Sequence, residues 1–207
     1  MIYEVRSYRL KPRTVPGFVK VFGEAYEGYR KDFSPLAAFF YSEIGPLNQV
    51  IHIWPYEDLA DRDRVRGEAA APGKWPPKTP EPPIHMESEI FKPFPFIGDF
   101  ASGKVGPIFE WRSYMIALGM MPGVMEGWKA AIEARRELSP VVMAMHTELG
   151  DLNKFVHIWA YESLDQRQAV RAEAMETGIW PPAGSPKGAI IAQENKILFA
   201  APFSPVQ

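Results

Sequence analysis

The alternation of apolar and polar side chains predicts one order of elements that occurs twice along the chain. Residues 2–10 alternate as a strand does, and apolar side chains then recur at three- and four-residue spacings over residues 15–29, as in an amphipathic helix. Two apolar runs, 38–44 and 49–56, flank Gly45-Pro46-Leu47-Asn48 and predict a hairpin. A second helix from residue 59 and a strand over 84–91 complete a β-α-β-β-α-β unit, the ferredoxin-like arrangement.

Identical residues recur at an offset of 106 and then 105 positions, which indicates a duplication. The recurring pairs include Glu4 and Glu110, Arg6 and Arg112, Tyr8 and Tyr114, His52 and His157, Trp54 and Trp159, and Trp75 and Trp180. We predict a first unit over residues 1–98, a Gly-rich linker over 99–106 and a second unit over 107–207. Because each four-stranded sheet must cover its open face, we expect the two units to pack sheet to sheet as an α+β fold.

Composition and charge exclude several classes of protein. The chain has 207 residues, 46% of them hydrophobic, which is enough for a packed core. Its 23 Lys and Arg residues nearly balance 25 Asp and Glu residues, so a nucleic acid partner is not expected. The lack of cysteine excludes disulfides and thiol catalysis. No apolar run is long enough for a membrane span, and no signal peptide pattern opens the chain, so we expect a cytoplasmic protein.

Known catalytic and cofactor motifs are missing from the sequence. It has no G-x-S-x-G, and no Ser, His and Asp residues follow a recognisable catalytic order. It also has neither G-x-G-x-x-G nor a P-loop, so no nucleotide cofactor is expected.

The first strand of each unit carries a carboxylate, a guanidinium and a phenol on one face. These candidates are Glu4, Arg6 and Tyr8, and in the second unit Glu110, Arg112 and Tyr114. An arginine beside a carboxylate can orient an anionic or carbonyl-bearing ligand. The alternative is a structural ion pair.

A hairpin that turns at Pro46-Leu47 would place further candidates on one sheet face. It would set Glu43 opposite Val50, Tyr41 opposite His52, and Phe39 opposite Trp54. In the second unit the same register would set Glu148 opposite Phe155, His146 opposite His157, and Ala144 opposite Trp159.

Two imidazoles and a carboxylate can bind a divalent metal, so His146, Glu148 and His157 form a candidate metal site. The alternative is that both His52 and His157 are half-buried and hydrogen-bonded within the sheet. Arg62 and Arg66, one helical turn apart, are expected to form a solvated face, and Trp54 and Trp75 to wall the core, with a pocket role as the alternative.

Several runs of this sequence resemble the NIPSNAP family. They are Tyr3-Glu4-Val5-Arg6-Ser7-Tyr8, Glu43-Ile44-Gly45-Pro46-Leu47-Asn48, His52-Ile53-Trp54-Pro55-Tyr56 and the helix 59–69. The second unit departs from this pattern at Leu149, Asp151 and Ala160. The resemblance implies a dimeric α/β barrel held within one polypeptide. No general reaction is implied, and eukaryotic members are linked to vesicle traffic and mitochondria.

Two functions are therefore open. One is a small-molecule binding protein, or an enzyme without an organic cofactor, of monooxygenase or isomerase type by analogy of fold. The other is a protein-interaction module without enzymatic activity. A closed pocket lined by His and Glu would favour the first, and an exposed apolar patch over a filled core the second. Either function is compatible with a homo-oligomer.

Overall fold

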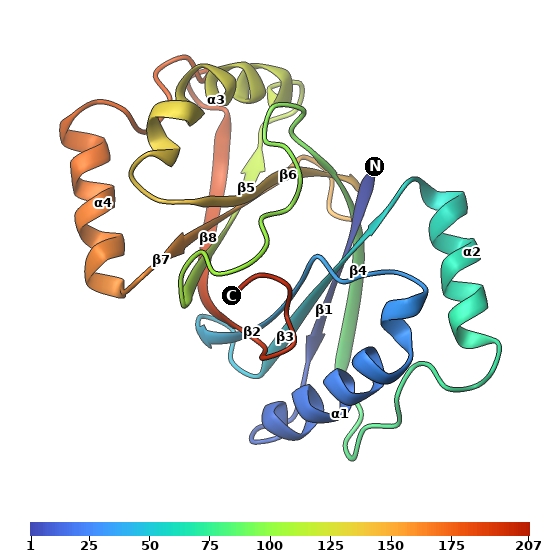
Figure 1. Ribbon diagram of the computed structural model, residues 1–207. Coiled ribbons are helices and arrows are strands. Elements are labelled where there is room, and N and C mark those ends of the chain that lie inside the picture. The colour runs from blue at the N-terminus through green and yellow to red at the C-terminus, as the bar shows by residue number, and fades with distance from the viewer.

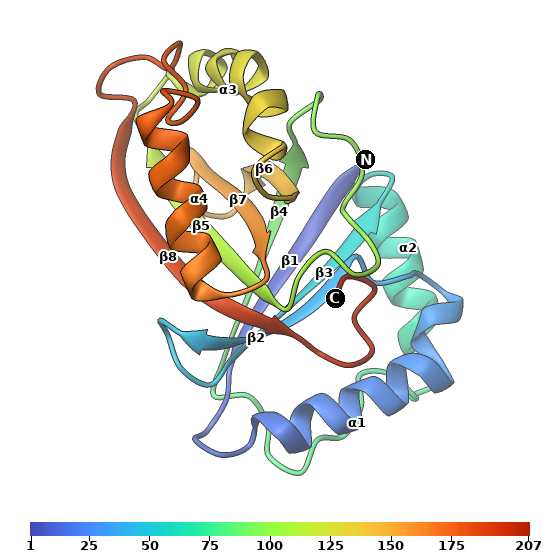
Figure 2. The ribbon, with the colours of Figure 1, turned by 60° about the vertical axis from the view of Figure 1, so that its left-hand side comes forward.

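Eight strands form one closed barrel, and four helices cover it from outside, α1 and α2 on one side and α3 and α4 on the other (Figure 1, Figure 2). The computed structural model describes residues 1–207. The strands are β1 (Ile2–Arg9), β2 (Ala38–Ile44), β3 (Gln49–Tyr56), β4 (His85–Pro93), β5 (Ile108–Ile116), β6 (Val141–Leu149), β7 (Lys154–Tyr161) and β8 (Ile190–Ala200). The helices are α1 (Val15–Gly28), α2 (Leu59–Ala70), α3 (Met121–Arg136) and α4 (Leu164–Glu176).

The strand order around the barrel is β1-β3-β2-β8-β5-β7-β6-β4. Each repeat supplies a four-stranded antiparallel sheet, and the repeats join where β2 pairs with β8 and β4 pairs with β6. No strand edge is left open, which removes the tendency of edge strands to pair with other chains. The predicted fold, two ferredoxin-like units packed sheet to sheet as an α/β barrel, is confirmed.

Strand alternation divides the apolar side chains between two layers. Phe40, Ile51 and Ile53 point into the barrel, where they share one core with Phe109 and Leu198 of the second repeat. The other face of the first sheet packs beneath α1. Its cluster includes Phe39, Val50, Trp54, Phe18 and Phe22. Since side chains of both repeats fill the barrel interior, the outer layers and the barrel mouth are the places left for a pocket.

The hairpin register differs from the prediction by two residues. Tyr41 lies opposite Val50 and Phe39 opposite His52, so the pairs predicted for Glu43, Tyr41 and Phe39 are wrong. Positive φ angles at Gly45 and Asn48 move the centre of the turn to Gly45-Pro46. A two-residue shift leaves every side chain on its predicted face, because the side-chain period of a strand is two.

The same shift occurs in the second hairpin. His146 lies opposite Phe155 and Ala144 opposite His157, so the predicted His146 and His157 pair does not form.

Two helix starts follow their sequence signals. The Asp58 side chain accepts a hydrogen bond from the Asp61 N–H at the start of α2, and Ser163 accepts one from the Gln166 N–H at the start of α4. Thr14 precedes α1, but its hydroxyl donates to the Lys11 carbonyl and caps nothing. No helix has the length and apolar character that crossing a membrane requires.

We expect residues 1–98 to self-associate or aggregate when produced alone. Without the second repeat, β2 and β4 become open edges and the inner face with Phe40, Ile51 and Ile53 is exposed to water. Size-exclusion chromatography with light scattering measures the outcome. A stable, soluble monomer of residues 1–98 would contradict this expectation.

Candidate functional site

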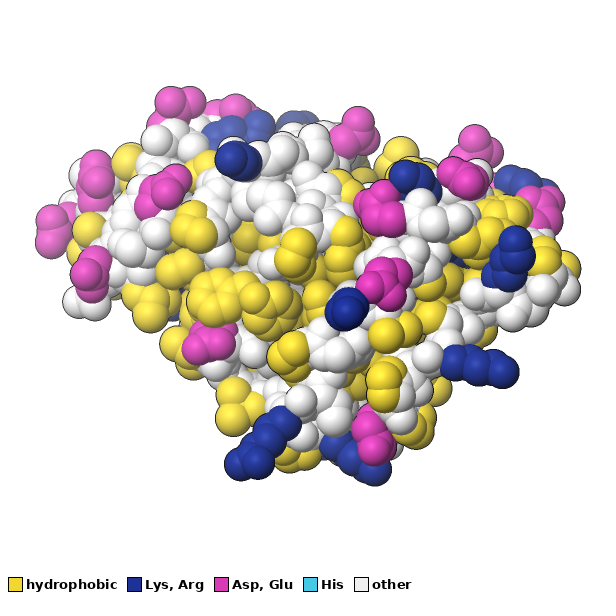
Figure 3. Space-filling view, turned by 60° about the horizontal axis from the view of Figure 1, so that its bottom comes forward, with side chains coloured by type: hydrophobic (Ala, Val, Ile, Leu, Met, Phe, Trp, Pro, Cys, Tyr) yellow, Lys and Arg dark blue, Asp and Glu magenta, His cyan; other side chains and the backbone are white.

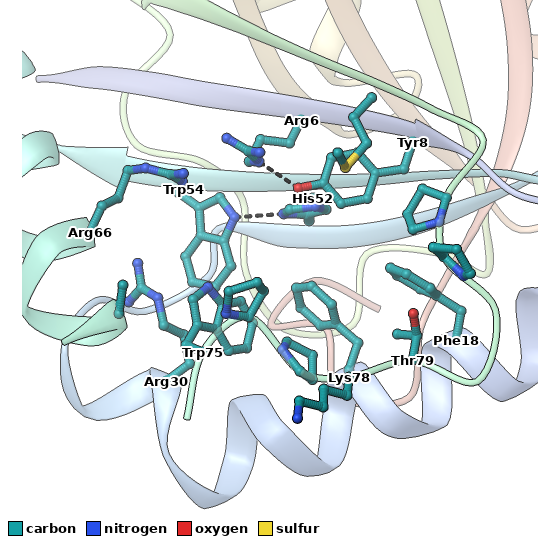
Figure 4. A pocket seen from close by; sticks show the side chains of 17 residues that line it. Arg6, Tyr8, Phe18, Arg30, His52, Trp54, Arg66, Trp75, Lys78 and Thr79 are labelled. Atoms are coloured by element: carbon teal, nitrogen blue, oxygen red, sulfur yellow. Dashed lines mark hydrogen bonds between the residues drawn. The ribbon is translucent and has the colours of Figure 1, made fainter. Parts of the chain in front are cut away.

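A cleft opens between the outer face of the first sheet and the helices α1 and α2. Its volume is about 490 Å³, within the range of small-molecule sites. Strands β1 and β3 form its floor, and the loop from Trp75 to Pro83 forms one wall (Figure 4). The lining side chains include Arg6, Tyr8, Phe18, Phe22, Arg30, His52, Trp54, Arg66, Trp75, Lys78 and Met86.

His52 on the floor is held in one orientation by its neighbour on the same strand face. The Trp54 indole N–H donates to His52 Nδ1 over 2.7 Å. Because an indole nitrogen is only a donor, Nδ1 carries no proton, and the neutral imidazole has its proton on Nε2. Burial lowers the pKa of His52 well below its ordinary value, and the charge of Arg6 lowers it further, so His52 is neutral at physiological pH.

The second nitrogen of His52 is a buried donor with no partner. Its Nε2 makes no hydrogen bond, although the side chain is buried and lines the cleft. An unpaired buried polar group costs free energy, so such groups in proteins usually have a partner. A ligand acceptor in the cleft would supply one.

Beside the cleft, on the same face of β1, the carboxylate of Glu4 is completely buried and bound by four side chains. Arg6 donates to it over 2.8 Å, Arg62 over 2.7 Å, Arg66 over 3.3 Å and Ser88 over 2.7 Å. Burial alone would raise the pKa of Glu4. The hydrogen bonds and charges of the arginines outweigh that effect and lower the pKa to about 2.

This network attaches α2 to the sheet, because Arg62 and Arg66 come from α2 and Glu4 from β1. The expectation that the two helix arginines form a solvated face is therefore wrong. A carboxylate held so firmly as an anion is also unsuited to act as a general base.

Arg30 is a further cation at the cleft, and it has no carboxylate partner. Its guanidinium lies 4.4 Å from the centre of the Trp54 ring and donates to the Tyr56 hydroxyl and the Ser34 carbonyl. Burial lowers the pKa of Arg30, but an arginine keeps its charge in proteins. Cation–π contact with Trp54 compensates part of its lost hydration.

The cleft has a positively charged end and an apolar end. Arg6, Arg30 and Arg66 lie on the Trp54 side, whereas Phe18 lies on the opposite side (Figure 4). No aspartate or glutamate lines the cleft. Its shape and charge therefore suit a molecule with an anionic group at one end and an apolar body.

The second repeat builds the same arrangement around a smaller cavity of about 250 Å³. Its lining includes Arg112, Tyr114, Arg135, His157, Trp159, Arg171 and Trp180. The Trp159 indole N–H donates to His157 Nδ1 over 2.7 Å, and His157 Nε2 again has no partner. Glu110 is buried between Arg112, Arg167 and Asn195, and its pKa is lowered to about 2.

The structure brings most of the predicted ligand-binding candidates together. Arg6, Tyr8, His52 and Trp54 line the first cleft with Glu4 next to them, and Arg112, Tyr114, His157 and Trp159 line the second with Glu110 next to them. Their role in binding stays a prediction.

Four candidates lie elsewhere. Tyr41 faces a groove between α1 and the C-terminal segment, and Glu43 is exposed in the hairpin. His146 Nδ1 lies 3.3 Å from the Thr147 carbonyl, and Glu148 pairs with Lys92 on the surface.

The candidate metal site is not assembled. His146, Glu148 and His157 make separate contacts because the hairpin register differs from the predicted one, and no group of three or more His, Asp or Glu side chains is positioned to hold a metal ion.

Sequence reasoning missed Arg30 and its counterpart Arg135, which lies 4.1 Å from the centre of the Trp159 ring. Arg30 follows α1, where the period of that helix no longer indicates which way a side chain points, and Arg135 lies in the last turn of α3. The signal that could have found them is their recurrence at an offset of 105 residues. Trp75, which was expected to wall the core with a pocket role as the alternative, forms part of the cleft wall.

We expect Glu4→Gln to lower the free energy of unfolding by about 3 to 5 kcal/mol, because the three arginines would lose their buried counter-charge. Glu68→Gln is the control, since its ion pair with Arg64 is exposed and should contribute less than about 1 kcal/mol. Urea unfolding at pH 7 measures both values. Similar losses for the two variants would contradict the expectation.

The pKa of Glu4 also predicts a pH dependence. Its folded pKa of about 2 lies below the ordinary value of 4.5, so its contribution is complete above pH 4.5 and is lost as the pH falls towards 2. Glu4→Gln should flatten that part of the stability profile, whereas Glu68→Gln should not.

A comparison with solved structures supports the fold. A putative monooxygenase from Fusobacterium nucleatum superposes with a TM-score of 0.62 over 97% of this chain and 92% of that protein, at 10% identity. This likeness concerns the architecture alone.

Comparisons of sequence identify the family. Human NipSnap homolog 3A is 29% identical over 100% of this chain and 86% of its own length, and mouse NipSnap homolog 3B is 30% identical over 99% and 85%. The NIPSNAP family profile matches residues 3–97 and again residues 109–205. The chain therefore belongs to the NIPSNAP family and carries two copies of its domain.

Proposed function

We propose that this protein binds a small organic anion in the cleft of its first repeat. The single observation that carries the proposal is the Nε2–H of His52, a buried donor without a partner that lies among three arginines on an aromatic floor. A ligand carboxylate or enolate oxygen would accept from His52, and its charge would be balanced by Arg6, Arg30 and Arg66.

The apolar end of the cleft indicates what the uncharged part of the ligand is. Phe18, Phe22, Trp75 and the prolines that follow it offer aromatic and aliphatic surface. Burying such a body contributes roughly 25 cal/mol per Å² of apolar surface. We therefore infer a ligand with an aromatic or branched apolar body and one anionic group.

The same groups suit a reaction that needs no organic cofactor. A neutral N–H donor and fixed guanidiniums stabilise negative charge that develops on a substrate oxygen, as in proton transfer next to a carbonyl group. Glu4 is held as an anion by its arginines, so a reacting proton would have to go to another acceptor, such as the substrate or water. On this proposal the cleft serves binding first and supports monooxygenase- or isomerase-type chemistry second.

The interaction-module alternative has two observations in its favour. An apolar groove between α1 and the C-terminal segment is lined by Val15, Val19, Tyr41 and Phe203. Hydrophobic side chains also gather across the middle of this side of the molecule, with charged side chains mostly around them (Figure 3). That function would not use His52 or Arg66, so substitutions in the cleft separate the two candidates.

We expect 2-naphthoate to bind the wild-type protein more tightly than the neutral 2-naphthamide, and Arg66→Gln to weaken naphthoate binding by about tenfold, or about 1.4 kcal/mol. Arg171→Gln is the matched control in the smaller second cavity and should leave this binding unchanged. Isothermal titration calorimetry measures the dissociation constants, and thermal melting checks that each variant is folded.

Equal affinities for the acid and the amide would overturn the anionic ligand class. Equal effects of Arg66→Gln and Arg171→Gln would remove the assignment to the first repeat. His52→Phe, which keeps a planar ring but removes the N–H donor, should also weaken naphthoate binding if the orphan donor contacts the anion.

A further inference from the structure

A further cavity, separate from the clefts of the two repeats, opens at the end of the barrel where the two hairpins lie. Its volume is about 270 Å³. Inward-facing side chains of both repeats line it as pairs at equivalent strand positions: Val5 with Trp111, Ser7 with Ser113, Gln49 with Lys154, Glu87 with Glu194, and Glu89 with Lys196. The cavity therefore lies on the pseudo-twofold axis that relates the repeats.

The strand registers establish the last of these pairs. Val5 lies opposite Glu89 in the first repeat, and its counterpart Trp111 lies opposite Lys196 in the second. The hairpin glycines agree: Gly150 packs against the Glu89 side chain, and Gly45 packs against Lys196. Lys196 therefore occupies the position that Glu89 has in the other repeat.

The two repeats therefore form equivalent contacts across the axis, but the side chains in the two contacts differ in charge. Lys154 donates to both oxygens of Glu89 over 2.7 and 2.9 Å, which is a complete ion pair. The equivalent contact joins Lys196 to the amide oxygen of Gln49 over 2.7 Å. Lys196 therefore has a neutral partner, Gln49, whereas Glu89 at the equivalent position of the first repeat has a charged partner, Lys154. The Nζ of Lys196 also lies 5.3 Å from the centre of the Trp111 ring.

We propose that Lys196 is a nucleophilic amine that forms an imine with a small aldehyde bound in the barrel mouth. The neutral Nζ would add to the carbonyl carbon, and the carbonyl oxygen would take a proton to give a carbinolamine. Loss of that hydroxyl as water, with loss of the remaining proton from nitrogen, forms the C=N bond. The step consumes no oxidant or reductant.

The charges around the mouth favour a neutral carbonyl compound over an anion. Glu87, Glu89, Glu194 and Asp151 face the cavity with only two ammonium groups, Lys154 and Lys196. Burial and the charge of Lys154 lower the pKa of Lys196 to about 8, against the opposing effect of the glutamates. A substantial fraction of Lys196 is then an unprotonated amine near neutral pH.

The experiment is reductive labelling of the full chain with butanal and sodium cyanoborohydride, followed by peptide mass spectrometry. We expect Lys196 to be modified at least roughly tenfold faster than Lys154 or the exposed lysines at pH 7.5, because ordinary lysines have a pKa near 10.4 and are almost fully protonated there. The rate at Lys196 should rise with pH and level off above about 8.

Two variants make the test specific. Gln49→Glu restores the carboxylate that the pseudo-symmetric contact has, and it should slow the labelling of Lys196 about tenfold while leaving the exposed lysines unchanged. Lys196→Met should remove the fast-labelled site altogether. Labelling of Lys196 at the rate of exposed lysines, or a rate insensitive to Gln49→Glu, would overturn the proposal.

Discussion

Backbone hydrogen bonds that pair β2 with β8 and β4 with β6 join the two repeats into one sheet without edges. This closure turns the inner faces of both sheets towards each other, where Phe40 contacts Phe109 at a ring distance of 4.9 Å. The interior is then filled, so cavities are left to the outer layers beneath the helices and to the mouth of the barrel. The position of each cavity follows from that constraint.

The buried carboxylates Glu4 and Glu110 connect the outer layers to the barrel. Each draws arginines of the second helix of its repeat down onto the first strand, and the helix covers the sheet next to the His and Trp pair. The ion network therefore has two effects. It holds the helix in place, and it surrounds a neutral histidine with guanidinium groups that outnumber the one buried carboxylate of each repeat.

Strand alternation was sufficient to predict the shared face of Glu4, Arg6 and Tyr8, because that face is a property of local sequence. With the repeat it also predicted two sheets packed face to face, and the resemblance to the family implied the barrel. Alternation and the repeat could not give the cross-strand partner of His52, which depends on the backbone angles at Gly45 and Asn48. They also could not place Arg30, since its direction is set by the packing of Trp54 after the helix has ended. The metal site predicted from His146, Glu148 and His157 does not form because the register of the second hairpin also differs from the predicted one.

Duplication within one chain removes the requirement that the two halves be identical, and the clefts show a physical consequence. In the second repeat, Gly127 and Gly123 of α3 let the loop at Ser185 and Pro186 pack directly on the helix, where any side chain would collide with it. The equivalent Gly17 of α1 has no atom within 4 Å of where a side chain would begin. Trp128 of α3 also takes the place that Phe22 of α1 has beside the histidine, and its larger ring takes up more of the space between helix and sheet.

The smaller second cavity is thus explained by loop contact and side-chain volume while its polar groups are retained. Retention of the His157, Trp159 and Glu110 arrangement around this smaller cavity indicates that these groups also stabilise the layer between helix and sheet. The first repeat keeps the same stabilising contacts and leaves the loop away from α1, so the space beside His52 remains open. Loop position and the side chain at Phe22 or Trp128 together therefore account for the larger cleft, in which we propose that a ligand binds.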